Sequence, residues 1–347
     1  MSAVTGRDRV NGDREPWGFC YEGKTLIVTG GSGQIGSALI RALSDLRCRI
    51  ISVSRSTAGG ERPVTSRADL TEIQGDIRDR TLWAKLLQDA DFVFHFAAQT
   101  SAYRANADPS ADFEVNALPV LRLLEFCQAQ SKSLGVLFAG TSTEIGLPPR
   151  VPVDESFAEC PITIYDVHKL LAEKYLMLGA STGVMQATVL RLTNVYGPGP
   201  RARDTGRGIL NLMIQRAIHG ESLTVYGDGT FVRDYVFIDD VARAFLLAGA
   251  RMDAVSGKFF VIGSGRGRPI GEAVKLIAER TARKIGRPAT VTHLPPPEGL
   301  LAIEQRNFVA DTTRFREATG WKPEVSLEEG IDRTIDHYWD REQAGQL

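Results

Sequence analysis

A tyrosine and a lysine four residues apart could form a proton-accepting pair. Tyr165 and Lys169 begin a segment predicted to be helical, residues 165–178, and their spacing places both side chains on one face of that helix. A tyrosine hydroxyl ordinarily has a pKa of about 10, which a neighbouring ammonium group lowers by favouring the phenolate. Tyr165 could therefore accept a proton near neutral pH. Because Tyr-x-x-x-Lys is a common pattern, its weight depends on its surroundings.

A hydroxyl residue at the end of a predicted strand could assist this pair. Thr141 directly follows the predicted strand 135–140. Strand ends at this edge of a doubly wound sheet are where ligands bind, so the hydroxyl could hydrogen-bond to a substrate oxygen as that oxygen loses its proton. Thr141 could instead cap a helix or turn, and Ser142 and Thr143 are alternative candidates for the same role.

Three glycines in the segment TGGSGQIG, residues 29–36, predict a phosphate-binding loop about 130 residues earlier. Gly30, Gly33 and Gly36 lie between a predicted strand and a helix with apolar residues at helical spacing. Such glycines make the tight turn, admit a pyrophosphate close to the backbone, and pack the helix on the strand. The helix N-terminus adds free N–H groups and a positive dipole end. We expect Gln34 and Ile35 to contact the same dinucleotide.

The next two predicted strands should bind the adenosine half of the cofactor. A carboxylate usually ends the second strand and binds the ribose, but here Ser54 and Arg55 stand at that position. A guanidinium suits a 2′-phosphate, which favours NADP(H) over NAD(H), although Arg55 could also be a solvated loop residue. Asp76 and Ile77 could meet the amino group and ring of adenine; Asp76 could equally be an ordinary aspartate at a strand end.

Strands and helices alternate in the order that builds a doubly wound α/β fold with a mainly parallel sheet. The predicted strands are residues 24–30, 49–53, 72–77, 91–98, 135–140 and 186–195. The predicted helices include residues 82–87, 113–130 and 165–178.

The second half of the chain predicts a smaller substrate-binding lobe. Glycine, proline and arginine cluster in residues 197–208, followed by a predicted helix at 208–219, a hairpin near 222–232 and a strand at 258–263. We expect the following organisation: a flexible extension at 1–20; a dinucleotide-binding (Rossmann) domain at 21–192 that also uses about 232–263; and a substrate-binding lobe formed by 193–231 and 264–340.

The composition favours a globular enzyme over several other classes of protein. The 347 residues include 41 basic and 42 acidic ones, so nucleic-acid or membrane-surface binding is not expected. The polar segment 1–20 does not resemble a secretion signal, and no apolar run is long enough for a membrane span. Cys48 and Cys127 lie in apolar stretches as expected buried thiols, which favours the cytoplasm, and the scattered histidines predict no metal site.

The ordered motifs resemble those of extended short-chain dehydrogenases/reductases, specifically the nucleotide-sugar epimerase/dehydratase group. The resemblance covers residues 24–335. Its motifs are TGGSGQIG (29–36), GDIRD (75–79), HFAAQTS (95–101), VNA (115–117), FAGTSTEIG (138–146), YDVHK (165–169), LRLTNVYGPG (190–199), YGDGTFVRDYVFIDDVARA (226–244) and TGWKPEVSLEEGI (319–331).

The resemblance implies a role for each matching position. Thr141 matches the active-site hydroxyl, five residues before Gly146, while Tyr165 matches the base and Lys169 its partner, which also holds the nicotinamide ribose. The cofactor side of the site would include Ala97, Ala98, Gln99 and Asn116, of which Asn116 also holds the active-site helix.

Three further residues would bind the diphosphate of a nucleotide sugar. Asn194 and Arg233 match the family at these positions, and Arg306 is a weaker candidate for the same role. Arg233 could instead form an ion pair with the adjacent Asp234.

Several departures from the family pattern narrow the chemistry. Sugar 4,6-dehydratases carry Asp-Glu directly after the active-site threonine, whereas this chain has Ser142-Thr143. Decarboxylating relatives carry glutamate two residues after it, where Thr143 stands, although a loop shift could bring Glu144 into the site. Ile145 replaces a usual tyrosine. His168 replaces a usual small residue, and its side chain could face either the solvent or the site.

The function expected from these observations is a nucleotide-sugar epimerase, acting at C4 through a 4-keto intermediate. An NADPH-dependent 4-keto-sugar reductase is the alternative, favoured by Ser54-Arg55, and a redox sensor without catalysis is a rival that usually lacks the tyrosine–lysine pair. The resemblance also implies a homodimer formed by helices 113–130 and 165–178. Their surplus apolar residues support this: Val120, Leu121, Leu124, Leu171 and Leu176.

Overall fold

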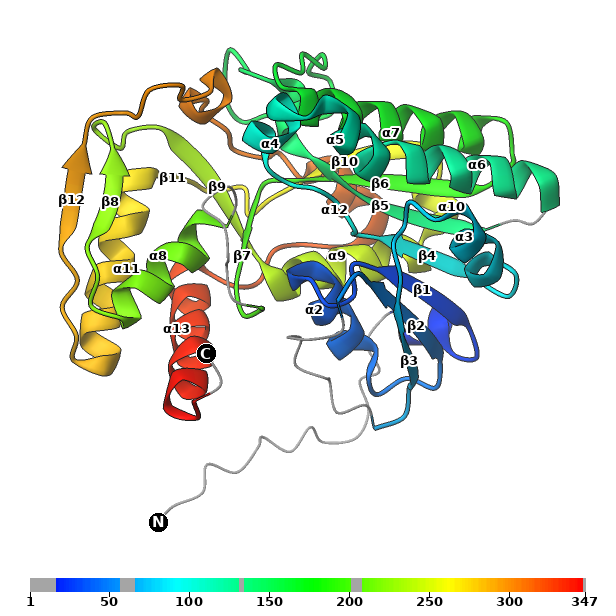
Figure 1. Cartoon of the computed structure of the whole chain (residues 1–347), viewed down its shortest axis with the longest axis horizontal. Coiled ribbons are helices and arrows are strands. Elements are labelled where there is room, and N and C mark those ends of the chain that lie inside the picture. The colour runs from blue at the N-terminus through cyan, green and yellow to red at the C-terminus, as the bar shows by residue number, and fades with distance from the viewer. Residues whose placement is uncertain (1–16, 57–65, 131–133, 201–207, 346–347) are drawn as a thin grey trace.

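A parallel sheet forms the centre of the larger part of the molecule. The computed structural model describes residues 17–56, 66–130, 134–200 and 208–345, and within these ranges seven strands pair in the order β10-β6-β5-β4-β1-β2-β3 (Figure 1). The connections run one way from β1 and the other way from β4, which opens a crevice at the carboxyl ends of the strands between them. The strands are β1 (Thr25–Thr29), β2 (Arg49–Ser54), β3 (Asp69–Gln74), β4 (Phe92–His95), β5 (Gly135–Thr141), β6 (Gln186–Leu192) and β10 (Lys258–Ile262).

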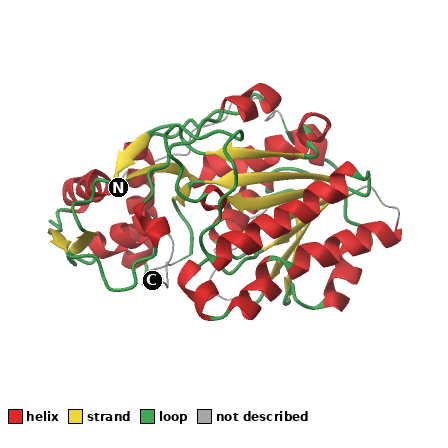
Figure 2. Cartoon of the chain, turned by 90° about the horizontal axis from the view of Figure 1, so that it is seen from above, coloured by secondary structure: helices red, strands yellow, loops and turns green. Residues whose placement is uncertain are grey.

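Helices cover both faces of this sheet, as the predicted doubly wound fold requires (Figure 2). Alternate side chains of a strand point to opposite faces. Accordingly, Leu26 and Val28 are buried in one hydrophobic cluster and Ile27 in the other. The first cluster includes side chains of α2 (Gln34–Leu43), α9 (Ile238–Ala250), α10 (Met252–Val255) and α12 (Thr313–Thr319), and the second those of α3 (Arg80–Leu87), α6 (Leu118–Gln130) and α7 (Ile164–Ser181).

The smaller lobe has a hydrophobic core of its own and lies beside the carboxyl ends of the sheet (Figure 1). Its helices are α8 (Ile209–Ile218), α11 (Ile270–Ile285) and α13 (Leu327–Gln343). Its strands β8 (Leu223–Tyr226) and β12 (Val291–Leu294) pair in parallel. A three-stranded sheet joins the two parts: β11 (Gly267–Pro269), β9 (Val232–Phe237) and β7 (Asn194–Tyr196).

Several predicted elements differ from the observed ones; the third strand, predicted at 72–77, is β3 at 69–74, and the fourth, predicted at 91–98, is the shorter β4. The predicted helix 113–130 is two helices, α5 (Pro109–Asn116) and α6, since the first ends at Asn116, with Ala117 as its C-cap, and Pro119 lies in the first turn of the next. The predicted strand 186–195 also divides, because the chain leaves β6 after Leu192 and β7 pairs with β9 instead. The predicted hairpin near 222–232 is wrong: β8 pairs with β12, and β9 with β7 and β11.

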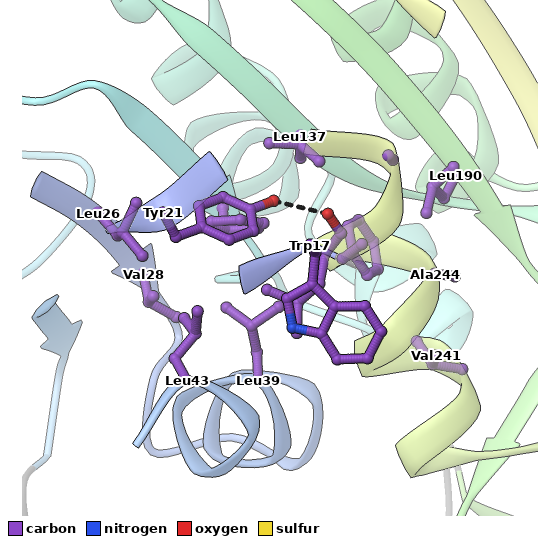
Figure 3. Packing of buried hydrophobic residues seen from close by; sticks show 14 of the residues in the cluster. Trp17, Tyr21, Leu26, Val28, Leu39, Leu43, Leu137, Leu190, Val241 and Ala244 are labelled. Carbon is purple, nitrogen blue, oxygen red and sulfur yellow. Dashed lines mark hydrogen bonds between the residues drawn. The ribbon is translucent and has the colours of Figure 1, made fainter. Parts of the chain in front are cut away.

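The predicted extension at residues 1–20 also differs from the structure at its carboxyl end. Residues 1–16 lie outside the described residues, but Trp17 is buried and α1 (Gly18–Tyr21) packs near α9. Tyr21 is fully buried, and its hydroxyl donates a hydrogen bond of 2.8 Å to the carbonyl oxygen of Leu246 (Figure 3). The segment from Trp17 to Tyr21 therefore belongs to the core. The polar composition of residues 1–20 as a whole did not predict this.

Three of the five apolar residues that support the predicted dimer are buried within the core of one chain. Val120, Leu124 and Leu176 are buried in the core beneath α6 and α7. Val167 and Leu178 are instead the large apolar side chains of α7 that remain exposed. Within the ranges that the structure describes, no helix is both long and apolar enough to cross a membrane.

Candidate functional site

A cavity of about 900 Å³ lies between the carboxyl ends of the parallel strands and the smaller lobe. It brings together residues that are up to 276 positions apart, from Gly30 to Arg306. The predicted site residues that line it are Gly30, Gly33, Gln34, Ile35, Gly36, Ser54, Arg55, Asp76, Ile77, Ala97, Ala98, Thr141, Tyr165, Lys169, Asn194, Arg233 and Arg306. Gln99 and Asn116, also predicted, do not line it.

The glycine loop is shaped for close approach of a phosphate group. Gly30 has a φ of +71°, and a Cβ atom there would lie 2.8 Å from the backbone nitrogen of Ala97. A Cβ atom at Gly36 would collide with the carbonyl oxygen of Gly30. Gly33 precedes the first turn of α2, whose free N–H groups and positive dipole end suit an anion. These residues fit the pyrophosphate of a dinucleotide.

The end of β2 presents hydroxyls and a guanidinium to the cavity. The Ser54 hydroxyl oxygen accepts a hydrogen bond of 2.9 Å from the backbone N–H of Ser32, which ties β2 to the glycine loop. Arg55 also lines the cavity, from the exposed bend that follows β2. On the neighbouring strand end, hydrogen bonds from Arg78 lower the pKa of Asp76, with a smaller contribution from Arg55, so Asp76 is charged.

Helix α7 carries the tyrosine–lysine pair. Thr163 caps this helix by accepting a hydrogen bond from the backbone N–H of Asp166, which places Tyr165 in the first turn and Lys169 one turn later. Both side chains are buried and line the cavity. The Lys169 ammonium lies 3.8 Å from the centre of the Phe138 ring. Burial, aided by the charge of Lys169, lowers the pKa of nearby His95 to about 3, so that histidine is neutral.

Thr141 caps a turn, the second of the two roles that we considered for it, and it also lies in the cavity wall. It caps the 3₁₀ turn η1 (Ser142–Ile145) by accepting a hydrogen bond of 3.3 Å from the Thr143 N–H. Its hydroxyl oxygen lies 2.8 Å from that of Thr143. Ser142 and Thr143 line the cavity too.

Glu144 points away from the cavity. Its carboxylate accepts a hydrogen bond of 3.1 Å from the Thr141 N–H and forms an ion pair of 3.1 Å with the buried Arg191. Burial, together with the neighbouring Glu173, raises the pKa of Glu144, while Arg191 opposes that rise. The loop shift that would bring Glu144 into the site is therefore not seen.

Gln99 and Asn116 form a structural junction behind the site. Asn116 accepts a hydrogen bond from the Gln99 N–H and donates one to the Gln99 carbonyl oxygen. The buried carboxylate of Asp112 accepts hydrogen bonds from both side chains, at 2.7 and 2.8 Å. It also lies 2.7 Å from Nδ1 of His168, which faces α5 rather than the solvent or the cavity. This junction fixes α5 against α7.

The smaller lobe contributes basic side chains to the other end of the cavity. Arg233 is buried and donates hydrogen bonds to the carbonyl oxygens of Glu304 (2.7 Å) and Arg306. Burial lowers the pKa of Arg233. Asn194 donates a hydrogen bond of 3.1 Å to the carbonyl oxygen of Asp234.

The alternative partner of Arg233 is occupied elsewhere. The Asp234 carboxylate accepts hydrogen bonds from the backbone N–H groups of Ser264, Gly265 and Ala310. Within the described ranges no ion pair joins Arg233 to Asp234. The guanidinium of Arg233 therefore remains part of the cavity wall, where an anionic group can meet it.

Our sequence reasoning missed Asp112 and Asp166. The Asp166 carboxylate accepts hydrogen bonds from Thr143 and Thr163 and lines the cavity beside Tyr165. A local signal existed for Asp166, because a threonine three residues before an acidic residue at a helix start is a capping pattern. Asn116 lies on the same helix as Asp112, but the other partners, Gln99 and His168, come from separate segments that no local pattern connects to it.

The sequence matches the family model described as "NAD dependent epimerase/dehydratase family" over residues 26–263. A UDP-glucose 4-epimerase from Mycolicibacterium smegmatis is 30% identical over 321 residues, covering 91% of this chain and 99% of that protein. A dTDP-glucose 4,6-dehydratase from Neisseria gonorrhoeae is 29% identical over 351 residues, covering 93% of this chain and 98% of the dehydratase.

Solved structures show the same architecture. The UDP-glucose 4-epimerase of Thermotoga maritima, determined with UDP-glucose, superposes with a TM-score of 0.81 at 31% identity, covering 92% of this chain and 99% of that chain. The UDP-glucose 4-epimerase of Thermus thermophilus, determined with NAD, gives a TM-score of 0.75 at 30% identity, covering 90% and 98% of the two chains.

Proposed function

The chain belongs to the NAD-dependent epimerase/dehydratase family, and from that premise we propose that it is a nucleotide-sugar 4-epimerase. One observation carries the proposal: a single cavity is lined by the glycine loop, by Thr141, Tyr165 and Lys169, and by Arg233 of the smaller lobe. That cavity can therefore hold a dinucleotide and a second anionic molecule together. Its residues supply a proton acceptor where the two would meet.

Each residue has a defined task in this mechanism. A nicotinamide dinucleotide held along the glycine loop would supply reversible hydride transfer at the reacting carbon of the sugar. Tyr165 accepts the proton of the reacting hydroxyl and donates it back, while the Lys169 ammonium favours the phenolate form. Thr141 makes a hydrogen bond at the same oxygen. Arg233, with Asn194 and Arg306, holds the diphosphate. The nucleotide sugar therefore stays bound while the sugar ring turns its opposite face toward the nicotinamide position.

The proposed chemistry is epimerisation rather than dehydration or decarboxylation. Both of those reactions use carboxylates after the active-site threonine, but Ser142 and Thr143 occupy these positions and Glu144 is turned toward Arg191. A redox sensor without catalysis is disfavoured because the tyrosine–lysine pair lines the cavity. A 4-keto-sugar reductase is the second candidate, since it would use exchangeable NADPH and the Ser54–Arg55 end of β2 suits the 2′-phosphate of that cofactor.

We propose NADP(H) as the cofactor, with NAD(H) as the alternative. The proposal rests on β2, which ends in the Ser54 hydroxyl and continues into Arg55 at the cavity wall. The guanidinium would pair with a 2′-phosphate, whereas NAD-specific sites usually place a carboxylate there. We further propose a homodimer in the cytoplasm.

The assay that tests the function follows sugar and cofactor together. Purified protein is denatured to identify any released nicotinamide, and intact protein is incubated with UDP-glucose or UDP-galactose. An epimerase interconverts the two sugars with no net consumption of NAD(P)H. A reductase consumes one NADPH for each keto sugar supplied. Failure to interconvert any nucleotide-sugar pair would contradict the proposal.

Arg233→Ala tests the substrate class separately. Loss of this buried guanidinium should weaken nucleotide-sugar binding by about 2–5 kcal/mol, as expected when one partner of a buried charged contact is removed. Isothermal titration with UDP-glucose and with UDP measures the effect. Equal weakening for both ligands supports a diphosphate contact, and unchanged binding would argue against a nucleotide sugar as the ligand.

A further inference from the structure

We propose that Glu144 is a positioning residue for Thr141, acting through the hydrogen bond that its buried side chain accepts from the Thr141 N–H. This inference rests on the proposed function of the cavity and deepens it. It assigns a task to a carboxyl group that points away from the cavity and that the mechanism above does not use.

The side chain of Glu144 closes the turn at whose start Thr141 stands. Its Oε1 accepts the Thr141 N–H at 3.1 Å, while the Thr141 hydroxyl accepts the Thr143 N–H at 3.3 Å. This reciprocal pair is a capping box, and Glu144 is 0% exposed. Because water does not reach the bond, its loss would leave the N–H without a partner or move the backbone of Thr141.

The other carboxyl oxygen of Glu144 is held from the neighbouring strand. Oε2 lies 3.1 Å from Nε of Arg191, and neither side chain is exposed. Arg191 stands on β6 opposite Gly140, where a Cβ atom would lie 3.3 Å from Cγ of Arg191. The glycine before Thr141 therefore gives the arginine room to reach Glu144.

Arg191 also connects this turn to the helix that carries the proposed base. Its guanidinium donates hydrogen bonds of 2.8 and 2.6 Å to Glu173. Tyr165, Lys169 and Glu173 are buried and follow one another at intervals of four on α7, so they share one face of that helix. A single buried guanidinium thus joins the turn after β5 to α7. Glu144 is the side chain through which this junction reaches the backbone beside the cavity.

The turn has other supports and does not require this carboxyl group in order to form. Gly146, with a φ of +72°, ends it, and the carbonyl oxygen of Glu144 accepts the Cys160 N–H at 3.0 Å. Two buried carboxyl groups, those of Glu144 and Glu173, also face one guanidinium. Replacing buried ionic groups by apolar side chains of similar volume is often neutral or stabilising. The position of Glu144 beside Thr141 therefore points to a role in the site.

Two substitutions separate the hydrogen bond from the volume of the side chain. Glu144→Leu fills similar space but cannot accept the Thr141 N–H. Its kcat for interconversion of UDP-glucose and UDP-galactose should fall about tenfold, the equivalent of one hydrogen bond of about 1.4 kcal/mol, and by no more than in Thr141→Val. KM should change little, because Arg233 is untouched. Glu144→Gln keeps an acceptor oxygen and should retain a kcat near that of the wild-type protein.

A double-mutant cycle shows whether Glu144 acts through Thr141. In the Thr141→Val background the hydroxyl to be positioned is already absent, so Glu144→Leu should lower kcat no further. If the two losses of kcat multiply, Glu144 supports the site by another route and the positioning role is overturned. Should Glu144→Leu not fold, Glu144→Val takes its place in the cycle, with the same expected results.

Glu155→Leu is the matched control. Glu155 also accepts a backbone N–H, that of Val261 at 2.8 Å, but it does so at β10, none of whose residues, all of them described, lines the cavity. This variant should lower the melting temperature and leave kcat unchanged. An equal fall of kcat in Glu155→Leu and Glu144→Leu would overturn the positioning role. A fall in Glu144→Gln as large as that in Glu144→Leu would overturn it too.

These outcomes differ from a failure of the proposed function. If the wild-type protein interconverts nucleotide sugars and folded Glu144→Leu keeps a normal kcat, only the positioning role is wrong. If the wild-type protein interconverts no nucleotide-sugar pair, the proposed function fails and this inference fails with it.

Discussion

Single side chains set the protonation states within the cavity. The phenol of Tyr165 lies on the same helix face as the ammonium of Lys169, while burial keeps His95 neutral behind them. Because His95 is neutral, Lys169 is not repelled by a second positive charge from this imidazole. A phenolate beside a cation is the form that can accept a proton.

Replacing the proposed base should lower turnover without loss of substrate affinity. Tyr165→Phe keeps the ring and removes the proton acceptor, so kcat should fall about 10²–10⁴-fold. Thr141→Val should lower kcat by a smaller factor, because Tyr165 is still present to accept the proton. Rates of sugar interconversion and the Kd for UDP-glucose measure the two effects. Near-normal turnover of Tyr165→Phe would show that another group takes the proton.

Arg55 should determine the preference between the two nicotinamide dinucleotides. Arg55→Ala removes the cation proposed for the 2′-phosphate and should weaken NADP(H) binding by about 1.5–3 kcal/mol. Binding of NAD(H), which lacks that phosphate, should change little. Titration with both cofactors measures the difference. Tighter binding of NAD(H) by the wild-type protein, or equal weakening for both, would assign NAD(H) instead.

At the scale of elements, the sequence predicts what local spacing determines. The glycine loop between a strand and a helix, and the pair Tyr165 and Lys169 on one helix face, need only neighbouring residues and were found where expected. The hairpin near 222–232 failed because β8 and β9 find their partners among β7, β11 and β12. Nothing within a short segment encodes such a choice, since strands from other parts of the chain compete for the same hydrogen bonds.

Side-chain partners from distant segments were unpredictable for the same reason. Arg233 donates to carbonyl groups more than 70 residues away, at positions 304 and 306, and Asp112 joins Gln99 to His168. Family motifs indicated that Arg233 belongs to the site, but they could not indicate what holds it. The family motif thus predicted that Arg233 lies in the cavity wall, but it did not predict the hydrogen bonds that hold its side chain there.

Helix α1 should stabilise the sheet core through Tyr21. Tyr21→Phe removes the hydrogen bond to Leu246 and should lower the free energy of unfolding by about 1 kcal/mol. The melting temperature measures this effect. Phe19→Ser, at an exposed position of the same helix, is the control and should change stability by less than about 0.5 kcal/mol. Equal effects of the two variants would mean that the Tyr21 hydroxyl contributes nothing specific.

A second substitution probes the same contact from the opposite helix. A Cβ atom at Gly249 would collide with the Tyr21 hydroxyl oxygen. Gly249→Ala should therefore destabilise the wild-type protein, and the destabilisation should be smaller in the Tyr21→Phe background, where the nearest ring carbon is 3.2 Å away. A double-mutant cycle on melting temperatures gives the coupling. Additive effects would place the collision elsewhere.

At the scale of the whole molecule, an apolar stripe on α7 favours pairing of two copies. Val167, Leu171 and Leu178 recur at helical spacing, and Val167 and Leu178 are 43% and 54% exposed. Helices α6 and α7 lie side by side over one face of the sheet, and α5 contacts both of them (Figures 1 and 2). A two-fold axis there would bury the stripe of each copy against the other.

Association through this face should respond to a charge placed on it. The wild-type protein should show twice the 37.9 kDa mass of one chain in light scattering at micromolar concentration. Val167→Glu or Leu178→Glu would bury an unpaired carboxylate at the interface and should give the mass of a single chain. Leu294→Glu introduces the same charge at a similarly exposed site, 44%, on β12 of the smaller lobe, and should remain dimeric. A wild-type protein of single-chain mass would refute the dimer. A dimer that survives Val167→Glu but dissociates with Leu294→Glu would move the interface to the smaller lobe.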